Sequence, residues 1–127
     1  MDQELIQDNM AHFAKIENNK VISILVVSND VLLDENGKEY DTNGIELLIS
    51  LTGHTHWVQT SYNSNFRNKF AVIGDTYDPE KDVFIGQQPY QSWVFNDDLL
   101  AWEAPIPMPA DGMYTWTEKD LTWKKIN

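Results

Sequence analysis

The first half of the chain alternates between short apolar runs and polar turn segments, as antiparallel strands do. Phe13–Ile16 and Val21–Val27 are rich in β-branched and apolar residues and have the length of strands. Glu17–Lys20 between them contains asparagines, which tolerate left-handed backbone angles. We therefore predict a β-hairpin. The second run is apolar on both faces, so we expect it to lie at the centre of a sheet.

The next segment changes from the strand pattern to the helix pattern. Asp34–Lys38 contains the turn dipeptide Asn-Gly and predicts a surface turn. Asn43 then stands three residues before Glu46, which is the spacing of a helix-capping pair. Leucines and isoleucines follow at helical spacing up to Gly53, a residue typical of a helix C-cap. This pattern predicts one short helix of about two turns.

Helical periodicity disappears after Gly53. Trp57–Tyr62 and Lys69–Gly74 are apolar at strand length and predict two further strands. Residues 63–68 between them are polar and predict a loop.

The last fifty or so residues carry an internal repeat. Tyr77–Phe84, Phe95–Trp102 and Trp116–Trp123 each place two aromatic residues seven positions apart around a centre of turn-forming residues. Such a centre predicts a hairpin in which the two aromatics face each other directly or diagonally across the strands. The proline-containing links Gln88–Tyr90 and Pro105–Pro109 separate the repeats and should run extended, because proline cannot donate to a sheet ladder.

Together these patterns predict a mainly β fold of α+β type with one short helix and antiparallel hairpins. We expect a polar N-terminal extension at residues 1–9 and a β-rich domain with the helix at residues 10–74. A tandem of three aromatic-bounded hairpins at residues 75–127 should pack on that domain or extend from it.

Charge and composition narrow the classes of function. The 20 acidic and 9 basic residues give a formal net charge of −11, which disfavours binding to nucleic acid and to anionic membranes. The sequence contains no cysteine, so disulfides and thiolate metal sites are excluded. No apolar run is long enough for a membrane helix, and the N-terminus lacks the features of a signal peptide. We expect a protein that is made and kept in a cytoplasm and needs no cofactor.

Several ordered motifs resemble a family of small proteins of marine tailed bacteriophages, cyanophages especially. The resemblance covers residues 10–127 and is carried by Met10–Ala14, Trp57–Asn63, Asn65–Arg67, Ile73–Asp78, Pro89–Val94, Trp102–Pro105 and Pro109–Gly112. It implies a phage protein of the virion, made in the cytoplasm of the host bacterium. It implies a structural or accessory role in the tail, fibre or capsid, and it brings no catalytic residues with it.

The residues offer little for catalysis. His54 and His56 would lie on one face of a strand and could share a metal, but no third ligand stands at a signature spacing. The carboxylates cluster in turn segments, where solvent keeps them ionised, and no nucleophile or phosphate-binding motif occurs. A hydrolase or a metal-dependent enzyme is therefore the weaker interpretation.

The aromatic residues of the hairpin region are the better candidates for a binding surface. They either form the core of a small β domain or lie exposed as an interface. The candidates for binding a partner or a glycan are Tyr90, Trp93, Trp102, Tyr114, Trp116 and Trp123.

Three hypotheses follow for the function. The first is a virion component that docks on other phage structural proteins, as a monomer or an oligomer. The second is a module that binds carbohydrate on the host surface. The third is an acidic inhibitor of a basic host protein, suggested by the net charge.

Overall fold

The computed structural model describes residues 10–126, and the predicted mainly β fold with one α-helix is confirmed within them. The chain divides into two compact units between Ile85 and Gly86. From the sequence we expected a boundary at residue 75, with all three hairpins after it. The first hairpin, at residues 76–85, instead continues the sheet of the first unit. The expected extension at residues 1–9 lies outside the described residues.

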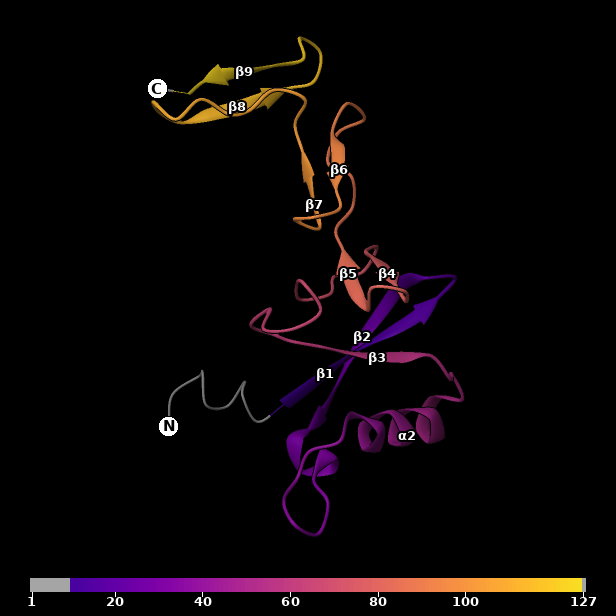
Figure 1. The fold of residues 1–127 in the computed structure, drawn as a ribbon. Coiled ribbons are helices and arrows are strands. Elements are labelled where there is room, and N and C mark those ends of the chain that lie inside the picture. The colour runs from indigo at the N-terminus through magenta and orange to yellow at the C-terminus, as the bar shows by residue number, and fades with distance from the viewer. Residues whose placement is uncertain (1–9, 127) are drawn as a thin grey trace. The chain divides into compact units, whose positions relative to one another are not determined.

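The first unit is built on an antiparallel sheet of five strands in the order β3-β1-β2-β4-β5 (Figure 1). The strands are β1 (Met10–Glu17), β2 (Lys20–Ser28), β3 (Trp57–Thr60), β4 (Thr76–Asp78) and β5 (Val83–Ile85). β2 occupies the middle of the sheet, as its apolar sequence predicted. β3 ends two residues before the expected Tyr62.

The β1–β2 hairpin is confirmed, with longer strands than the apolar runs alone indicated. Asn18 and Asn19 form its turn with φ angles of 53° and 63°, and Glu17 pairs with Lys20 across it. Two successive left-handed residues match the twist of a tight hairpin, which explains the asparagines.

Helix α2 (Asp41–Thr52) begins earlier and runs longer than predicted, after a 3-10 helix η1 (Asn29–Leu32). The predicted cap was wrong: Tyr40 occupies the N-cap, and the side chain of Asn43 donates instead to the carbonyl of Leu32 at 3.0 Å. The C-cap is confirmed, because Gly53 has a φ of 77° and its N–H donates to the carbonyl of Ile49.

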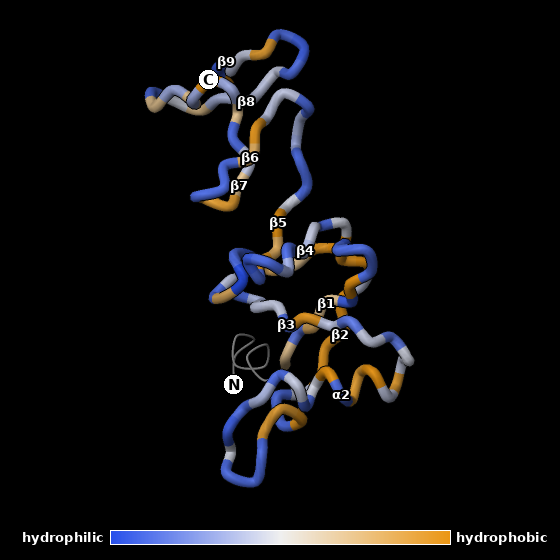
Figure 2. The backbone as a smooth tube through the Cα atoms, turned by 45° about the vertical axis from the view of Figure 1, so that its right-hand side comes forward, coloured by the Kyte–Doolittle hydropathy of each residue, from blue (hydrophilic) through white to orange (hydrophobic). Residues whose placement is uncertain are grey.

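The sheet of the first unit has a hydrophobic cluster on each face. Phe13 of β1, Leu48 of α2 and Trp57 of β3 belong to the cluster beneath the helix. Ile16 and Phe84 belong to the other cluster, which the β4–β5 hairpin helps to form. Apolar stretches, coloured orange in Figure 2, lie within β2 and α2. The connection between η1 and α2 is mostly hydrophilic.

The strand predicted at Lys69–Gly74 is absent, and this segment is an irregular loop. Side chains occupy the N–H groups that a strand would use: Ala71 donates to Oγ1 of Thr60 at 2.8 Å, and Val72 donates to the carboxylate of Asp75 at 2.9 Å. Of its apolar residues, Ala71 is buried in the cluster with Ile16 and Phe84, whereas Val72 and Ile73 are exposed, so the apolar composition here does not mark a strand.

The three aromatic-bounded hairpins are confirmed. The second unit contains the hairpins β6 (Val94–Asn96) with β7 (Ala101–Glu103) and β8 (Tyr114–Thr117) with β9 (Thr122–Lys125). In each hairpin, the first included, the two aromatics face each other directly across the strands; the pairs are Tyr77 with Phe84, Phe95 with Trp102, and Trp116 with Trp123.

The three turns share their backbone geometry as well. The last residue of each four-residue turn is left-handed, with φ angles of 56° at Asp82, 55° at Leu100 and 52° at Leu121. In the first two hairpins the side chain before the turn, Asp78 or Asn96, accepts two backbone N–H groups of the turn. The repeat is therefore structural and not only compositional.

The left-handed position predicts a stabilising substitution. Leu121→Gly should stabilise the β8–β9 hairpin by about 0.5–1 kcal/mol, because a left-handed leucine is strained and glycine is not. The leucine side chain is half exposed, so little packing is lost. Thermal unfolding measures the effect. Leu99→Gly, at an exposed turn residue without a positive φ, is the matched control and should destabilise. Equal effects of the two substitutions would contradict the assignment of strain.

Candidate functional site

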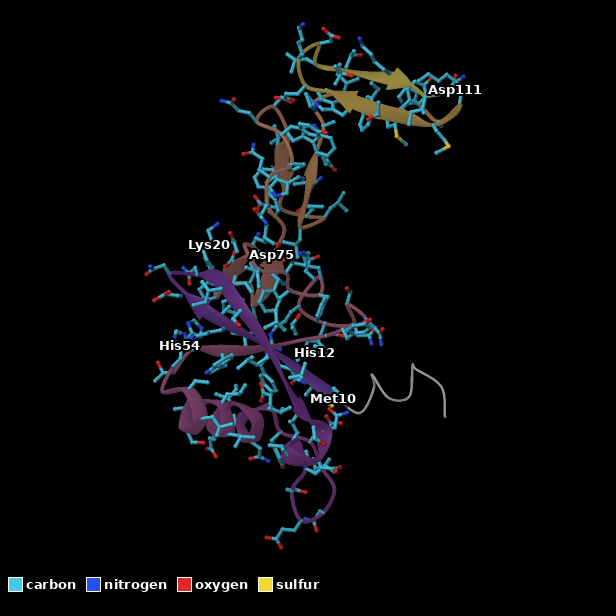
Figure 3. The ribbon with its side chains drawn as sticks, turned by 180° about the vertical axis from the view of Figure 1, so that it is seen from behind. Met10, His12, Lys20, His54, Asp75 and Asp111 are labelled. Carbon is cyan, nitrogen blue, oxygen red and sulfur yellow. The ribbon has the colours of Figure 1, made fainter. Side chains whose placement is uncertain are left out.

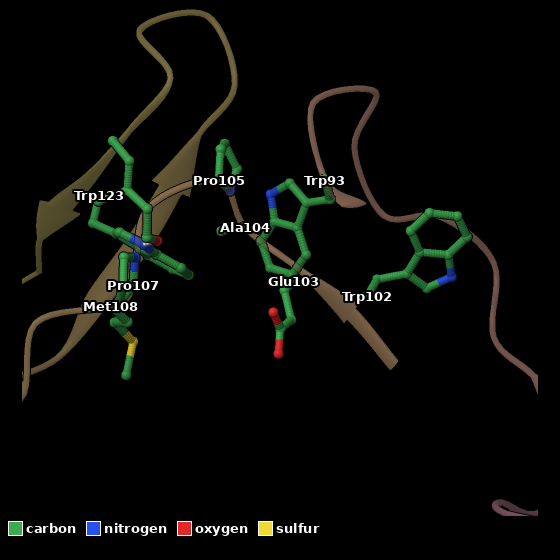
Figure 4. Close-up of a pocket in the computed structure, with 9 residues that line it drawn as sticks. Trp93, Trp102, Glu103, Ala104, Pro105, Pro107, Met108 and Trp123 are labelled. Atoms are coloured by element: carbon green, nitrogen blue, oxygen red, sulfur yellow. Dashed lines mark hydrogen bonds between the residues drawn. The ribbon is translucent and has the colours of Figure 1, made fainter. Parts of the chain in front are cut away.

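A groove of about 510 Å³ lies on the second unit and is open to solvent (Figure 4). We call it the tryptophan groove; Trp93, Trp102, Glu103–Met108 and Trp123 line it. The tryptophans come from separate segments: Trp93 precedes β6, Trp102 lies on β7 and Trp123 lies on β9. Both hairpins of the unit and the proline link between them therefore form the groove.

Two of the three indoles are held by the chain's own carbonyl groups. Nε1 of Trp102 donates to the carbonyl of Gly86 at 2.8 Å, and its ring lies 5.2 Å from that of Phe95. Nε1 of Trp123 donates to the carbonyl of Ile106 at 2.7 Å, which holds the proline link against β9. With their N–H groups engaged, these rings offer mainly their faces to a ligand.

The indole of Trp93 is held by ring contacts, whereas its backbone N–H donates to the carbonyl of Tyr90 at 3.1 Å and its carbonyl accepts from Nε2 of Gln88 at 3.0 Å. Its ring centroid lies 5.6 Å from that of Tyr90, 6.0 Å from that of Trp116 and 6.1 Å from that of Trp123. Its Nε1 is buried and has no hydrogen-bond partner among residues 10–126. Burying a donor without a hydrogen bond costs about 1–3 kcal/mol of folding free energy. The ring contacts of Trp93 must offset this cost.

Glu118 connects the segment before β6 to the β8–β9 hairpin. Its carboxylate accepts from Oγ of Ser92 at 2.6 Å, from the backbone N–H of Ser92 at 3.0 Å and from Nε1 of Trp116 at 2.8 Å. This three-bond contact, which we call the Glu118 clasp, brings Trp93 to the groove beside Trp123.

The Glu118 clasp predicts an acid-sensitive second unit. Hydrogen bonds from Ser92, and then from Trp116, hold the pKa of the Glu118 carboxyl below its ordinary value of 4.5. A depressed pKa contributes stability above the ordinary value, and this contribution is lost as the pH falls through the folded-state pKa. Near-ultraviolet circular dichroism of the tryptophans should therefore decline on acidification.

Glu118→Gln should remove this pH dependence and lower the signal at neutral pH. Glu80→Gln, at an exposed turn carboxylate of the first unit, is the control and should leave the pH profile unchanged. A profile that is the same in wild type and Glu118→Gln would contradict the role of the clasp.

The structure separates the six aromatic residues that the sequence nominated. Trp93, Trp102 and Trp123 line the groove, where Trp93 and Trp123 contact each other, and Tyr90 supports Trp93 from outside it. Trp116 is 6% exposed and belongs to the interior of the unit. The last of the six, Tyr114, donates its hydroxyl to Asp111 at 2.7 Å and does not line the groove.

Sequence reasoning missed Glu103 as a groove residue. Its position directly after Trp102 and before the proline link was the available signal, because any groove between β7 and that link includes it. Glu103 is exposed, and its Oε1 accepts from Nδ2 of Asn96 across the hairpin at 2.9 Å.

The strand placement assumed for His54 and His56 was wrong, because β3 begins only at Trp57. A ring nitrogen of His54 lies 2.7 Å from the carbonyl oxygen of Ile16, while the ring of His56 contacts that of Tyr77 at 6.0 Å. Figure 3 shows His54 and His12 on separate parts of the first unit. No three histidine or acidic side chains gather as a possible metal site in the described part of the chain.

A second hollow, of about 410 Å³, lies on the first unit beside Arg67 and Asp82. Arg67 donates its Nε to the Asp82 carboxylate at 2.8 Å, and the hydroxyl of Tyr77 donates to the same oxygen at 2.6 Å. Burial, then the neighbouring Asp82, raises the pKa of Tyr77 to about 12. These groups engage one another and hold the β4–β5 hairpin to the loop before it.

Comparisons with family models, with curated proteins and with solved structures find no match for this chain. Within residues 10–126 no helix has the length and hydropathy needed to span a membrane.

Proposed function

We propose that the chain is a non-catalytic assembly protein of a bacteriophage particle, and that its second unit docks on another particle protein through the tryptophan groove. The phage context is supported by the family resemblance of the sequence motifs. The docking role is supported by the construction of the second unit. On this proposal the protein is made in the bacterial cytoplasm and acts in the virion.

The observation that carries the proposal is the small interior of the second unit. Among its described residues only Trp116 is buried. Its strands form two separate two-stranded sheets, and an isolated hairpin of this kind is marginally stable in water. Units of about this size commonly need a disulfide, a metal or a partner chain for stability. The sequence contains no cysteine, and a partner would supply the missing burial.

The exposed apolar side chains of the second unit agree with this interpretation. Ile106 and Met108 on the proline link are about half exposed. Met113 and Ile126 are about 60% exposed and lie side by side, because the N–H of Ile126 donates to the carbonyl of Met113 at 2.8 Å. Contiguous apolar surface beside aromatic residues is typical of a protein interface.

Quantitative mass spectrometry of purified particles tests the proposal. We expect the wild-type chain in the particle, and Trp123→Ala should reduce its amount, because the substitution removes a wall of the groove and the hydrogen bond to Ile106. Leu51→Ala, at a residue of the first unit that is 71% exposed, is the control and should leave the amount unchanged. Absence of the wild-type chain from particles would overturn the proposal.

Carbohydrate binding is the second candidate, favoured by the hydrogen bond from Asn96 to Glu103, a carboxylate that lines the groove together with tryptophans. In an aromatic-lined groove, an amide and a carboxylate can bind the hydroxyl groups of a sugar while an indole stacks on the sugar ring. Trp102→Ala would then abolish binding to a glycan array while the chain remains folded. Binding to protein components of the particle with no glycan signal would decide for docking.

A further inference from the structure

We propose that the occupant of the tryptophan groove is an arginine side chain of the partner protein. The inference rests on the proposed docking function and specifies the chemistry of the partner. It follows from the charge, the ring faces and the composition of the chain.

The groove contains an uncompensated negative charge. Glu103 is the single charged residue among those that line it. Its Oε1 accepts from a neutral amide, and Oε2 has no partner within residues 10–126. The lysines that follow Trp123 form ion pairs with other carboxylates: Lys124 pairs with Asp120 at 2.6 Å, and Lys125 lies 3.9 Å from Asp111. An apolar occupant would desolvate Glu103 without a counter-charge, which is costly.

The tryptophans favour a cation over a neutral polar group. Indole faces carry the negative part of the ring quadrupole and attract guanidinium and ammonium groups. Trp123 donates its N–H group to the carbonyl of Ile106, so it presents its ring faces to the groove. A cation that stacks on an indole and reaches Glu103 would satisfy both features of the groove.

Arginine fits these features better than lysine does. Its guanidinium is planar, stacks on aromatic rings and donates two parallel hydrogen bonds to a carboxylate. An ammonium is a compact, strongly hydrated point charge that offers no planar stacking. The groove is open to solvent, and its volume of about 510 Å³ is large enough for an arginine side chain.

A second copy of this chain is a poor source of the arginine. The sequence contains a single arginine, Arg67. Its Nε donates to Asp82 and a terminal nitrogen donates to the carbonyl of Gln59 at 3.1 Å, so the side chain is already engaged. The net charge of −11 also opposes self-association and favours a basic partner.

Peptide titration of the full chain, followed by tryptophan fluorescence and by calorimetry, tests the inference. The probe is a short capped peptide with one arginine between glycine and serine residues. The same peptide with lysine, or with the neutral isostere citrulline, serves for comparison. We expect the arginine peptide to bind most tightly, the lysine peptide less tightly and the citrulline peptide at least about tenfold more weakly than arginine.

The groove carboxylate is tested by a matched pair of variants. Glu103→Gln should weaken the arginine peptide about three- to tenfold and leave the citrulline peptide unchanged. Asp98→Asn removes the same charge from the turn of the same hairpin, outside the groove, and should change affinity less than about twofold.

Equal binding of the arginine and citrulline peptides, or equal effects of the two variants, would overturn the inference. The first result would indicate an uncharged occupant, and the second would indicate general attraction to an acidic surface. The proposed docking function would survive either result if the chain is found in particles and Trp123→Ala removes it.

Discussion

Gly44→Ala is expected to destabilise the first unit by about 1–3 kcal/mol, although alanine normally stabilises a helix interior relative to glycine by up to about 1 kcal/mol. The reason is the close contact between α2 and the sheet. A Cβ atom at Gly44 would lie 2.6 Å from Cζ and 2.8 Å from Cε1 of Phe13, and Phe13 is fully buried. The helix or the ring must therefore move, and the cluster beneath the helix loosens.

Urea unfolding of the first unit measures this effect, with Ser50→Ala on the exposed side of the same helix as the control. That control should be neutral or slightly stabilising, because alanine has the higher helix propensity. Combining Gly44→Ala with Phe13→Leu should cost less than the sum of the two single changes, since leucine lacks the clashing ring atoms. Additive costs, or a stabilising Gly44→Ala, would contradict the close contact.

Trp116→Ala should unfold the second unit and leave the first unit folded. Truncation of a buried tryptophan costs about 3–5 kcal/mol, which is a large part of the stability available to so small a unit. The change removes ring contacts to Trp93 at 6.0 Å and Trp123 at 5.3 Å, and it removes one bond of the Glu118 clasp. No other buried side chain of the described second unit replaces it.

Hydrogen–deuterium exchange separates the two units in this experiment. Amides of β6–β9 should lose protection in Trp116→Ala, while amides of β1–β3 keep it. Leu121→Ala, at a half-exposed residue of the same hairpin, is the control and should leave both units protected. Simultaneous loss of protection in both units would contradict the division at Ile85 and Gly86.

The repeat was predictable because hairpin geometry depends on spacing. When two aromatic residues stand seven positions apart with a four-residue turn between them, the strand register places them opposite each other. Phe95 faces Trp102 in this way, as expected. The same holds for Gly53, since a left-handed C-cap favours glycine wherever it occurs.

Features that depend on distant side chains were not predictable. Lys69–Gly74 has strand composition, but Thr60 and Asp75 take its backbone N–H groups, and no local pattern signals that competition. The predicted start of the helix was wrong for the same reason, because the side chain of Asn43 donates to the carbonyl of Leu32 and does not cap the helix. Nothing local predicted which aromatics would be buried.

The groove itself shows the same limit. The sequence nominated Trp93, Trp102 and Trp123 together with Tyr90, Tyr114 and Trp116, because all belong to aromatic-rich segments. Which of them face a common space depends on the Glu118 clasp, a contact between residues 26 positions apart. Long-range contacts of this kind cannot be derived from one sequence by periodicity.

Hydroxyl-radical footprinting of the chain, free and in purified particles, tests the central claim most directly. We expect Trp93, Trp102 and Trp123 to be oxidised in the free chain and protected in the particle, because docking covers the tryptophan groove. Tyr62 of the first unit, 44% exposed, is the internal reference and should be oxidised equally in both. Unchanged oxidation of the three groove tryptophans in the particle, with protection of Tyr62 instead, would contradict docking through the groove.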